Sequence, residues 1–223
     1  EVELTSADHG AGMWIQHYDI EVKDEAGPVY RGNSYFGFFP PEALAQQVGI
    51  PGAVARTIPP REANRARAFT IPRLKSGVTE PFRMVEDVEI YVPQGGVAGL
   101  GFIRGGIDID PEAWFFDAHF QGDPVWPGSL GLESMLQLMR VVAEDLWKDD
   151  GPWIPRTMAP NIPHRWHYRG QILPGQNRVC LEATVKSIDR DQRVLIADGL
   201  LSVDGLPIYS MEDFSMQQLR EDR

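Results

Sequence analysis

The sequence predicts an α+β fold in which an antiparallel sheet wraps around one long buried helix. The helix is expected at about residues 129–147, where apolar side chains cover nearly the whole circumference, as in a helix that is buried on all sides. Several long strands separated by turns precede and follow it. A buried helix must be covered, and these strands are the elements that can cover it, which gives the wrapped-sheet architecture.

The first part of the chain is expected to hold strands and a short helix. Residues 14–22 alternate apolar and polar side chains, residues 24–27 form a turn, and the chain is extended again up to about residue 38. A short helix is expected over residues 41–48, because prolines open it and a glycine ends it. Residues 51–81 are rich in Pro and Arg and lack periodicity, which indicates a linker that crosses a surface.

From about residue 82 the pattern changes to strands arranged around the long helix. Alternating or β-branched stretches indicate the strands, and turns that contain glycine, proline or aspartate separate them. The expected strands are residues 85–92, 98–109, 163–172, 177–188, 192–203 and 206–215.

A short pattern near the start of the chain recurs near its end. In residues 28–30 and again in residues 207–209, a turn leads into Pro-apolar-Tyr, and a further aromatic residue follows five positions after the Tyr. A true repeat predicts that residues 1–50 are the tail of a preceding, related unit. Ordinary hairpin chemistry explains the pattern equally well.

Composition excludes several classes of protein. The chain has 223 residues and a net charge of −11, which argues against a nucleic-acid partner because backbone binding needs clustered positive charge. No run of 18 apolar residues indicates a membrane span, and no signal peptide opens the chain. The single cysteine, Cys180, excludes an internal disulfide framework and fits a reducing, cytoplasmic location as a buried, inert thiol.

Basic residues nevertheless cluster at two places. They form either a solvated linker and a strand edge, or a docking patch for an acidic carrier protein or a phosphate. The two clusters are Arg61, Arg65, Arg67, Arg73 and Lys75, and Arg165 and Arg169.

One segment places a histidine before a turn and a carboxyl group at the start of the long helix. Residues 115–118 are expected to end an extended segment, so that His119 precedes the turn at residues 122–124. Ser129 is a suitable N-cap, which puts Glu133 one position beyond the place of a capping-box glutamate. A carboxyl group among Leu and Met side chains either pairs or takes up a proton, and a protonated carboxyl group can act as a general acid.

Two glycines, Gly128 and Gly131, are expected to leave the helix start bare of side chains, so that a ligand can approach the backbone. The first-turn N–H groups are then free to polarise a carbonyl group. Gln137 lies four residues after Glu133, on the same helix face, where it can orient the carboxyl group. Together with His119 as a base, these groups are what removal of water from an activated acyl chain requires.

Other sites are not supported by the sequence. His164 and His167 lie three residues apart on an expected strand and point to opposite faces, which is poor geometry for a shared metal. The glycines between residues 99 and 106 precede no helix, so they do not form a dinucleotide-binding fingerprint. The acidic residues at 108–112 lack the glycine of a calcium loop.

At the start of the long helix the chain resembles a known family. Residues 119–137 read His-Phe-x-Gly-Asp-Pro-Val-x-Pro-Gly-x-Leu-Gly-Leu-Glu-x-Met-x-Gln. This segment is similar to the active-site segment of the β-hydroxydecanoyl thioester dehydratase of bacterial fatty-acid synthesis. It is similar, too, to the dehydratase domains of polyunsaturated fatty acid synthases and related polyketide synthases. The resemblance covers residues 82–223 well and residues 1–81 more loosely.

The resemblance implies a hotdog fold, with a long central helix wrapped by an antiparallel sheet, assembled as a homodimer or as a fused double hotdog. Residues 82–223 would form the catalytic hotdog domain, residues 51–81 a linker, and residues 1–50 the tail of a preceding hotdog-like unit. In the family, the histidine and the acid of one site come from different hotdog units. The second unit would therefore be a partner chain or an upstream half.

The resemblance also assigns roles to residues. It implies that His119 is the base, that Glu133 is the acid, and that the Gly128 N–H holds the thioester oxygen. The dehydratase-isomerase of the family has Asp where this chain has Glu133, and dehydration-only relatives have Glu, which leaves double-bond isomerisation open. The supporting residues are Gln137, Phe120 and Val125.

The implied reaction is dehydration of a 3-hydroxyacyl thioester, carried on the phosphopantetheine of an acyl carrier protein, to the enoyl thioester. It belongs to fatty acid or polyketide synthesis of the polyunsaturated fatty acid type and needs no metal or redox cofactor. The implied partners are the acyl carrier protein and the other domains of a synthase. Two alternatives remain: a thioesterase on the same scaffold, which would release a free acid, and a non-catalytic hotdog domain that docks a carrier protein.

Overall fold

The computed structural model describes residues 1–10, 12–71, 80–120, 122–148 and 153–220. The chain divides into two units, Glu1–Gln47 and Val48–Arg223. The sequence placed the first boundary after residue 50, close to this division. Within the described residues, none of the helices has both the length and the apolar character that a transmembrane helix needs.

The first unit is a three-stranded antiparallel sheet in the order β1-β2-β3, followed by one turn of helix. Asp24 closes the β2–β3 hairpin, because its Oδ1 accepts hydrogen bonds from the N–H groups of Ala26 (2.8 Å) and Gly27 (3.1 Å). The two expected strands and their turn are confirmed, whereas the first strand was not expected from the sequence. The elements are β1 (Val2–Gly10), β2 (Met13–Asp24), β3 (Gly27–Phe38) and α1 (Pro41–Leu44).

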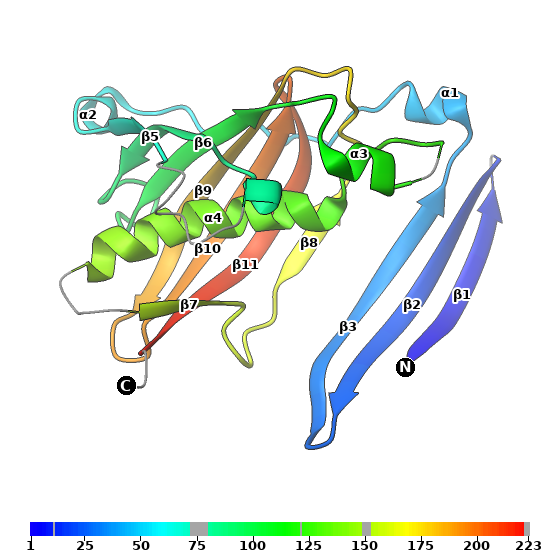
Figure 1. Ribbon diagram of the computed structural model, residues 1–223, viewed down its shortest axis with the longest axis horizontal. Helices are drawn as coiled ribbons and strands as arrows, with labels where there is room; N and C mark the ends of the chain where they lie inside the picture. Colours follow the sequence, from blue (N-terminus) through cyan, green and yellow to red (C-terminus); the bar gives the residue numbers. More distant parts are fainter. Residues whose placement is uncertain (11, 72–79, 121, 149–152, 221–223) are drawn as a thin grey trace. The chain divides into compact units, whose positions relative to one another are not determined.

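The second unit contains an eight-stranded antiparallel sheet around one long helix, α4 (Figure 1). The strand order is β4-β5-β6-β9-β10-β11-β7, and β8 pairs with the first part of β11. Its elements before and including the long helix are α2 (Pro60–Ala63), β4 (Arg67–Thr70), the 3₁₀ turn η1 (Glu80–Phe82), β5 (Asp87–Val92), β6 (Phe102–Asp108), α3 (Trp114–Ala118) and α4 (Gly128–Trp147). The later elements are β7 (Trp153–Thr157), β8 (Arg165–Tyr168), β9 (Arg178–Asp189), β10 (Val194–Val203) and β11 (Leu206–Arg220).

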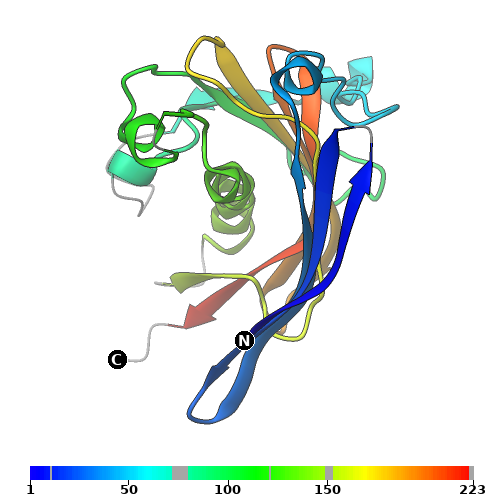
Figure 2. The ribbon, with the colours of Figure 1, turned by 90° about the vertical axis from the view of Figure 1, so that its right-hand side faces the viewer.

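The core of this unit lies between α4 and the concave face of the sheet. Figure 2 looks nearly along α4 and shows the sheet curving around it. The helix contacts β6, β9, β10 and β11, and strand β9 alternates buried and partly exposed residues over most of its length, as a strand with one covered face must. The expected α+β hotdog architecture is therefore confirmed. Buried helix residues include Leu130, Met135, Leu138, Met139, Val142 and Trp147.

Two local predictions next to the long helix were wrong. Residues 115–118 are not extended but form most of the short helix α3. In an extended chain Phe115 and Phe116 would point to opposite faces, whereas one helical turn lets both rings approach Trp126, at centroid distances of 4.6 and 6.3 Å. Helix α4 begins at Gly128 with Pro127 as its N-cap, so Ser129 is its second residue and not its cap.

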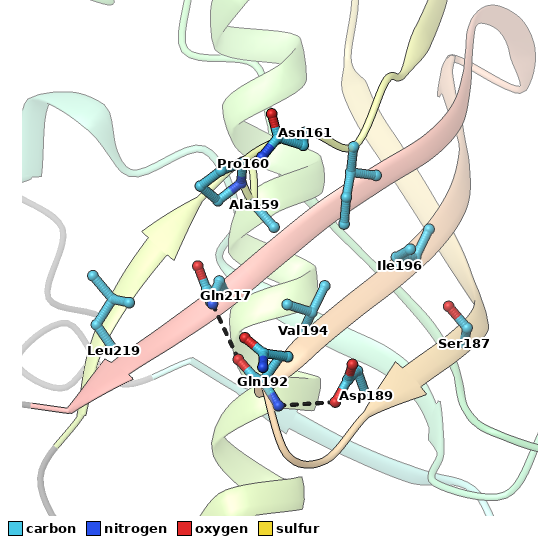
Figure 3. A pocket seen from close by; sticks show the side chains of 11 residues that line it. Ala159, Pro160, Asn161, Ser187, Asp189, Gln192, Val194, Ile196, Gln217 and Leu219 are labelled. Carbon is cyan, nitrogen blue, oxygen red and sulfur yellow. Dashed lines mark hydrogen bonds between the residues drawn. The ribbon is translucent and has the colours of Figure 1, made fainter. Parts of the chain in front are cut away.

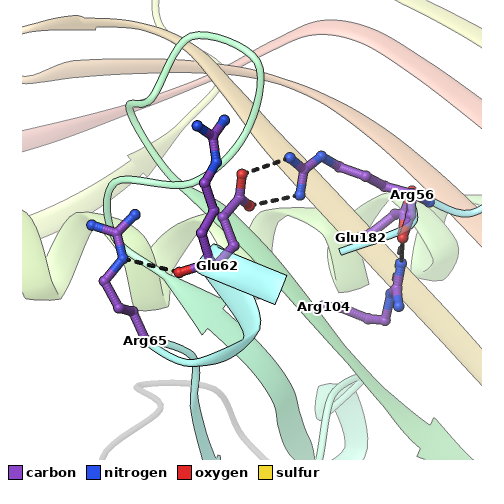
Figure 4. Close-up of polar contacts among 6 residues, drawn as sticks. Arg56, Glu62, Arg65, Arg104 and Glu182 are labelled. Atoms are coloured by element: carbon purple, nitrogen blue, oxygen red, sulfur yellow. Dashed lines mark hydrogen bonds and ion pairs between the residues drawn. The ribbon is translucent and has the colours of Figure 1, made fainter. Parts of the chain in front are cut away.

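The segment expected as a linker contributes to the sheet. Its strand β4 pairs with β5, and Arg56 ties the preceding chain to the outer face of the sheet (Figure 4). The Arg56 N–H donates to Glu182 Oε1 (2.8 Å), and the Arg56 carbonyl accepts a bond from the Arg104 guanidinium (2.7 Å). The Arg56 guanidinium makes two bonds to Glu62 (2.8 and 2.9 Å) and lies over the Phe102 ring. Because polar contacts hold this part of the segment, its sequence shows no hydrophobic periodicity from which the contacts could be predicted.

Candidate active site

His119 is held by a reciprocal pair of contacts across the turn that follows it. It is the C-cap of α3, and its carbonyl accepts a bond from the Val125 N–H (3.0 Å). Its Nδ1 in turn lies 3.2 Å from the Val125 carbonyl oxygen. Because a carbonyl oxygen can only accept, we assign the ring proton to Nδ1, which leaves Nε2 of the neutral ring as a proton acceptor. The Val125 carbonyl therefore fixes the orientation of the His119 ring.

Phe120 covers one face of the histidine ring. The two ring centroids are 4.0 Å apart and the planes are inclined by 30°. The Phe120 side chain is itself 59% exposed. Reciprocal backbone bonds between Phe120 and Asp123 (3.0 and 3.1 Å) close the turn beneath it. Stacking and the Val125 contact together restrict both the tilt and the rotation of the imidazole.

Glu133 lies in the second turn of α4 and is oriented by Gln137. The Gln137 Nε2 donates to Glu133 Oε1 (2.9 Å) and to the Phe82 carbonyl (2.8 Å), while its Oε1 accepts a bond from the Met84 N–H (2.9 Å). Gln137 is buried, and the Met84 contact fixes which end of the amide is the oxygen. These two backbone contacts fix the orientation of the Gln137 amide, and the fixed amide in turn orients the Glu133 carboxyl group. No Lys, Arg or His in the described part of the chain forms an ion pair with Glu133.

The two glycines at the start of α4 are explained by packing against aromatic rings. A Cβ on Gly131 would lie 2.2 Å from Cε2 of Tyr209. A Cβ on Gly128 would lie 2.8 Å from Cη2 of Trp166 and 3.3 Å from Cε2 of Tyr168. Rings from β8 and β11 thus lie where a side chain at residue 128 or 131 would be, so packing by itself requires both glycines, and the approach of a ligand to the backbone there stays a prediction.

The N–H groups at the start of α4 can still polarise an oxygen. The N–H groups of Leu130 and Gly131 donate to the Pro127 carbonyl (2.9 and 3.3 Å). The N–H groups of Gly128 and Ser129 come before the first residue that can find an acceptor within the helix. The 20 residues of α4 direct the positive end of the helix dipole at the same point. A thioester oxygen placed there would be stabilised as it gains negative charge.

The aromatic cluster that packs on the helix start was missed by the sequence interpretation. The rings of Tyr168 and Tyr209 lie 4.8 Å apart, and Trp166 meets both. Burial raises the pKa of Tyr168 and of Tyr209. One signal was available: Trp166 and Tyr168 are two residues apart, so both lie on one face of their strand. Their partner Tyr209 could be found only in the folded structure.

Other residues considered in the sequence have structural environments. His164 packs against the Phe214 ring at 4.7 Å, and burial lowers its pKa. Burial raises the pKa of the Cys180 thiol to about 11, as expected for an unreactive cysteine. In the described residues, no group of three or more His, Cys, Asp or Glu side chains could hold a metal ion.

The basic clusters are only partly described. Arg67 pairs with Asp145 (2.7 Å) and Arg165 pairs with Glu212 (3.4 Å). Arg73 and Lys75 lie outside the described residues. These pairings use the charge of Arg67 and Arg165 within the chain, which weakens the interpretation of those two residues as part of a docking patch.

A shallow pocket on the outer face of the sheet contains none of the predicted site residues (Figure 3). It lies between the chain after β7 and the ends of β9, β10 and β11. Its polar groups serve the β9–β10 turn: the Gln192 N–H donates to Asp189 Oδ1 (2.8 Å), and Gln217 donates to the Gln192 carbonyl (3.1 Å). The pocket is thus part of a hairpin and not of the candidate active site.

Comparisons with known proteins agree with the fold, and the matched region includes the segment that holds these residues. Residues 78–212, more than half of the chain, match the FabA-like domain. A polyunsaturated fatty acid synthase subunit from Thraustochytrium sp. is 30% identical over 232 residues, which cover 92% of this chain and 15% of that protein. The chain therefore spans only a small part of this relative.

A solved structure shows the same fold. The dehydratase heterocomplex ApeI:P from Xenorhabdus doucetiae superimposes with a TM-score of 0.51 at 13% identity, covering 70% of this chain and 94% of that one. At this identity the likeness concerns the fold alone. The domain match, which covers more than half of the chain, shows that the chain belongs to the FabA-like family, and the hotdog fold agrees with that family.

Proposed function

We propose that this chain removes water from 3-hydroxyacyl thioesters carried on the phosphopantetheine arm of an acyl carrier protein, and so forms enoyl thioesters. The observation that carries the proposal is the orientation of His119. Its Nδ1 faces the Val125 carbonyl, and its Nε2 remains available as a base. This base belongs to the same short segment as an oriented carboxyl group, Glu133, and a helix start whose first N–H groups have no acceptor within the helix.

In the proposed mechanism, Nε2 of His119 takes a proton from C2 of the substrate, which the thioester acidifies. The electron pair of the broken C–H bond moves toward the thioester oxygen, where the Gly128 N–H and the start of α4 stabilise the charge. As the C2–C3 double bond forms, the C3–O bond breaks, and protonated Glu133 gives its proton to the departing hydroxyl group. One water leaves, and proton exchange with solvent resets both side chains. Each acid–base contribution is worth about 10²–10⁴-fold in rate.

The supporting residues act on the two reacting groups and not on the substrate. Val125 and Phe120 hold the imidazole in one orientation. Gln137 aims the carboxyl group of Glu133 through an amide that two backbone groups lock. Such fixed geometry matters because acid–base catalysis requires the reacting atoms within hydrogen-bond distance. The proposed chemistry uses no metal or redox cofactor.

The proposal includes a second hotdog unit and a carrier protein. In the family that the motif resembles, the base and the acid of one site belong to different units, supplied here by a partner chain or by an upstream half. The relative from Thraustochytrium sp. is a synthase subunit, which supports the other domains of a fatty acid synthase as partners.

The test is mass spectrometry of a 3-hydroxyacyl carrier protein after incubation with the purified protein. The wild type should produce a species that is lighter by one water. His119→Ala should lower the rate by at least about 10²-fold. The control is His167→Ala, since His167 lies on the face of β8 opposite to Trp166 and Tyr168, and it should retain wild-type turnover. Near wild-type dehydration by His119→Ala would refute the assignment, and release of free acid would identify a thioesterase.

A further inference from the structure

Two large aromatic side chains, one at the end of η1 and one at the start of α3, remain about half exposed. Phe82 is 47% exposed and Trp114 is 46% exposed. Their ring centroids lie 5.7 Å apart in an edge-to-face arrangement. The Trp114 Nε1 donates to the Pro81 carbonyl (2.8 Å), which holds the two rings together. We refer to Phe82 and Trp114 as the aromatic pair.

The aromatic pair is attached to both reacting groups. The Phe82 carbonyl accepts a bond from the same Gln137 nitrogen that donates to Glu133, so one amide fixes the acid and the backbone of Phe82. Trp114 is the first residue of α3, the short helix whose C-cap is His119. The pair therefore lies on the two segments that position the acid and the base.

The aromatic pair offers an apolar surface for the hydrocarbon chain of the substrate. In the proposed reaction Glu133 serves the hydroxyl group on C3, and the hydrocarbon chain of the substrate begins at the next carbon. An exposed Phe, whose backbone shares the Gln137 amide with that carboxyl group, and the exposed Trp packed against it would gain from contact with methylene groups. Each methylene group removed from water contributes about a fourfold gain in binding.

We propose that the acyl chain of the substrate lies on the aromatic pair beyond C3, and that Phe82 and Trp114 set the preference for long chains. The inference rests on the proposed dehydration of 3-hydroxyacyl thioesters. It adds specificity-determining residues that neither the motif at residues 119–137 nor the acid–base geometry identifies.

The experiment compares 3-hydroxyacyl pantetheine thioesters of four and twelve carbons. The wild type should have the higher kcat/KM with the twelve-carbon substrate. Phe82→Ala should lower kcat/KM for the twelve-carbon substrate about 10- to 20-fold more than for the four-carbon one, which corresponds to lost contact with about two methylene groups. Phe82→Leu, which keeps an apolar side chain, should retain most of the preference, and the loss should appear mainly in KM.

A matched control is Phe69→Ala in the edge strand β4. Phe69 is 38% exposed, comparable to Phe82, but it makes no contact with the Gln137 amide. This variant should keep the wild-type ratio between the two substrates. Two results would overturn the proposal. One is a Phe82→Ala protein that unfolds at the wild-type urea midpoint and keeps the wild-type ratio of kcat/KM between the two substrates. The other is an equal loss of kcat/KM with both substrates.

A binding measurement separates this inference from the proposed function. Calorimetry with S-alkylpantetheine thioethers of four and twelve carbons, which cannot be dehydrated, measures binding of the hydrocarbon chain without any turnover. If the wild type dehydrates neither thioester but Phe82→Ala still weakens binding of the long thioether selectively, the proposed function fails and the acyl surface stands. If Phe82→Ala changes the oligomeric state in size-exclusion chromatography and leaves both binding constants unchanged, the pair is an interface between copies and the inference fails.

Discussion

Replacement of Gly131 by alanine tests the packing that sets the start of α4. Gly131 lies one helical turn after Pro127, and a Cβ added to it would point at the Tyr209 ring of β11. The same helical turns carry the Gly128 N–H and Glu133. A methyl group at residue 131 should therefore affect both stability and the proposed catalysis.

The magnitude follows from the distances. The new Cβ would lie 2.2 Å from Cε2, 3.0 Å from Cδ2 and 3.2 Å from Cζ of Tyr209. Tyr209 is fully buried between Trp166 and Tyr168, so the ring cannot simply turn away. Overpacking of this kind costs about 1–3 kcal/mol, and so close a contact belongs at the upper end. The better helix propensity of alanine returns about 1 kcal/mol, which leaves a net loss of about 2 kcal/mol.

Urea unfolding followed by circular dichroism measures this loss as a lower midpoint at unchanged slope. The control is Gly175→Ala, at an exposed turn where an added Cβ meets no atom within 4 Å, and it should stay within about 0.5 kcal/mol of the wild type. Gly131→Ala should also dehydrate more slowly, because the helix start must move. A Gly131→Ala protein as stable as the wild type would refute the packing explanation.

Two further predictions concern the polar contacts. Gln137→Ala should slow dehydration about tenfold, because Glu133 loses its orienting donor, and should cost about 1–3 kcal/mol of stability, because two backbone groups lose their partners; turnover and urea midpoints check both. The Arg56 guanidinium beside Glu62 lowers the pKa of that buried carboxyl group, so its contribution is present above the unfolded value of about 4.3 and is lost as the pH falls below it. Glu62→Gln should therefore lower stability by about 1–3 kcal/mol at pH 7 and flatten the dependence of the urea midpoint on pH between about 3 and 6, whereas an unchanged dependence would contradict this role.

The sequence predicted the features that depend on local patterns. The apolar circumference of α4 identifies a buried helix wherever it packs, and alternation identifies β9 without knowledge of its neighbours. The segment that holds His119 and Glu133 stood out for a similar reason, because its residue types follow one another within a single turn and helix start.

Features that depend on tertiary contacts were not predicted. Strand β4 is exposed at every position and exists because β5 lies beside it, and β7 is an edge strand that contains Pro155. Helix α3 forms because Phe115 and Phe116 both dock on Trp126. The need for glycine at residue 131 comes from a tyrosine far along the chain. None of these causes is visible within a short window of sequence.

The most direct test of the central claim uses a 3-hydroxyacyl thioester that carries two deuterium atoms at C2. His119 and Glu133 should act on adjacent carbons, so the wild-type product should lack one deuterium and the hydroxyl group. His119→Ala and Glu133→Gln should each form this product at least about 10²-fold more slowly while unfolding at the wild-type urea midpoint. A product that keeps both deuterium atoms, or wild-type rates in both variants, would contradict the account.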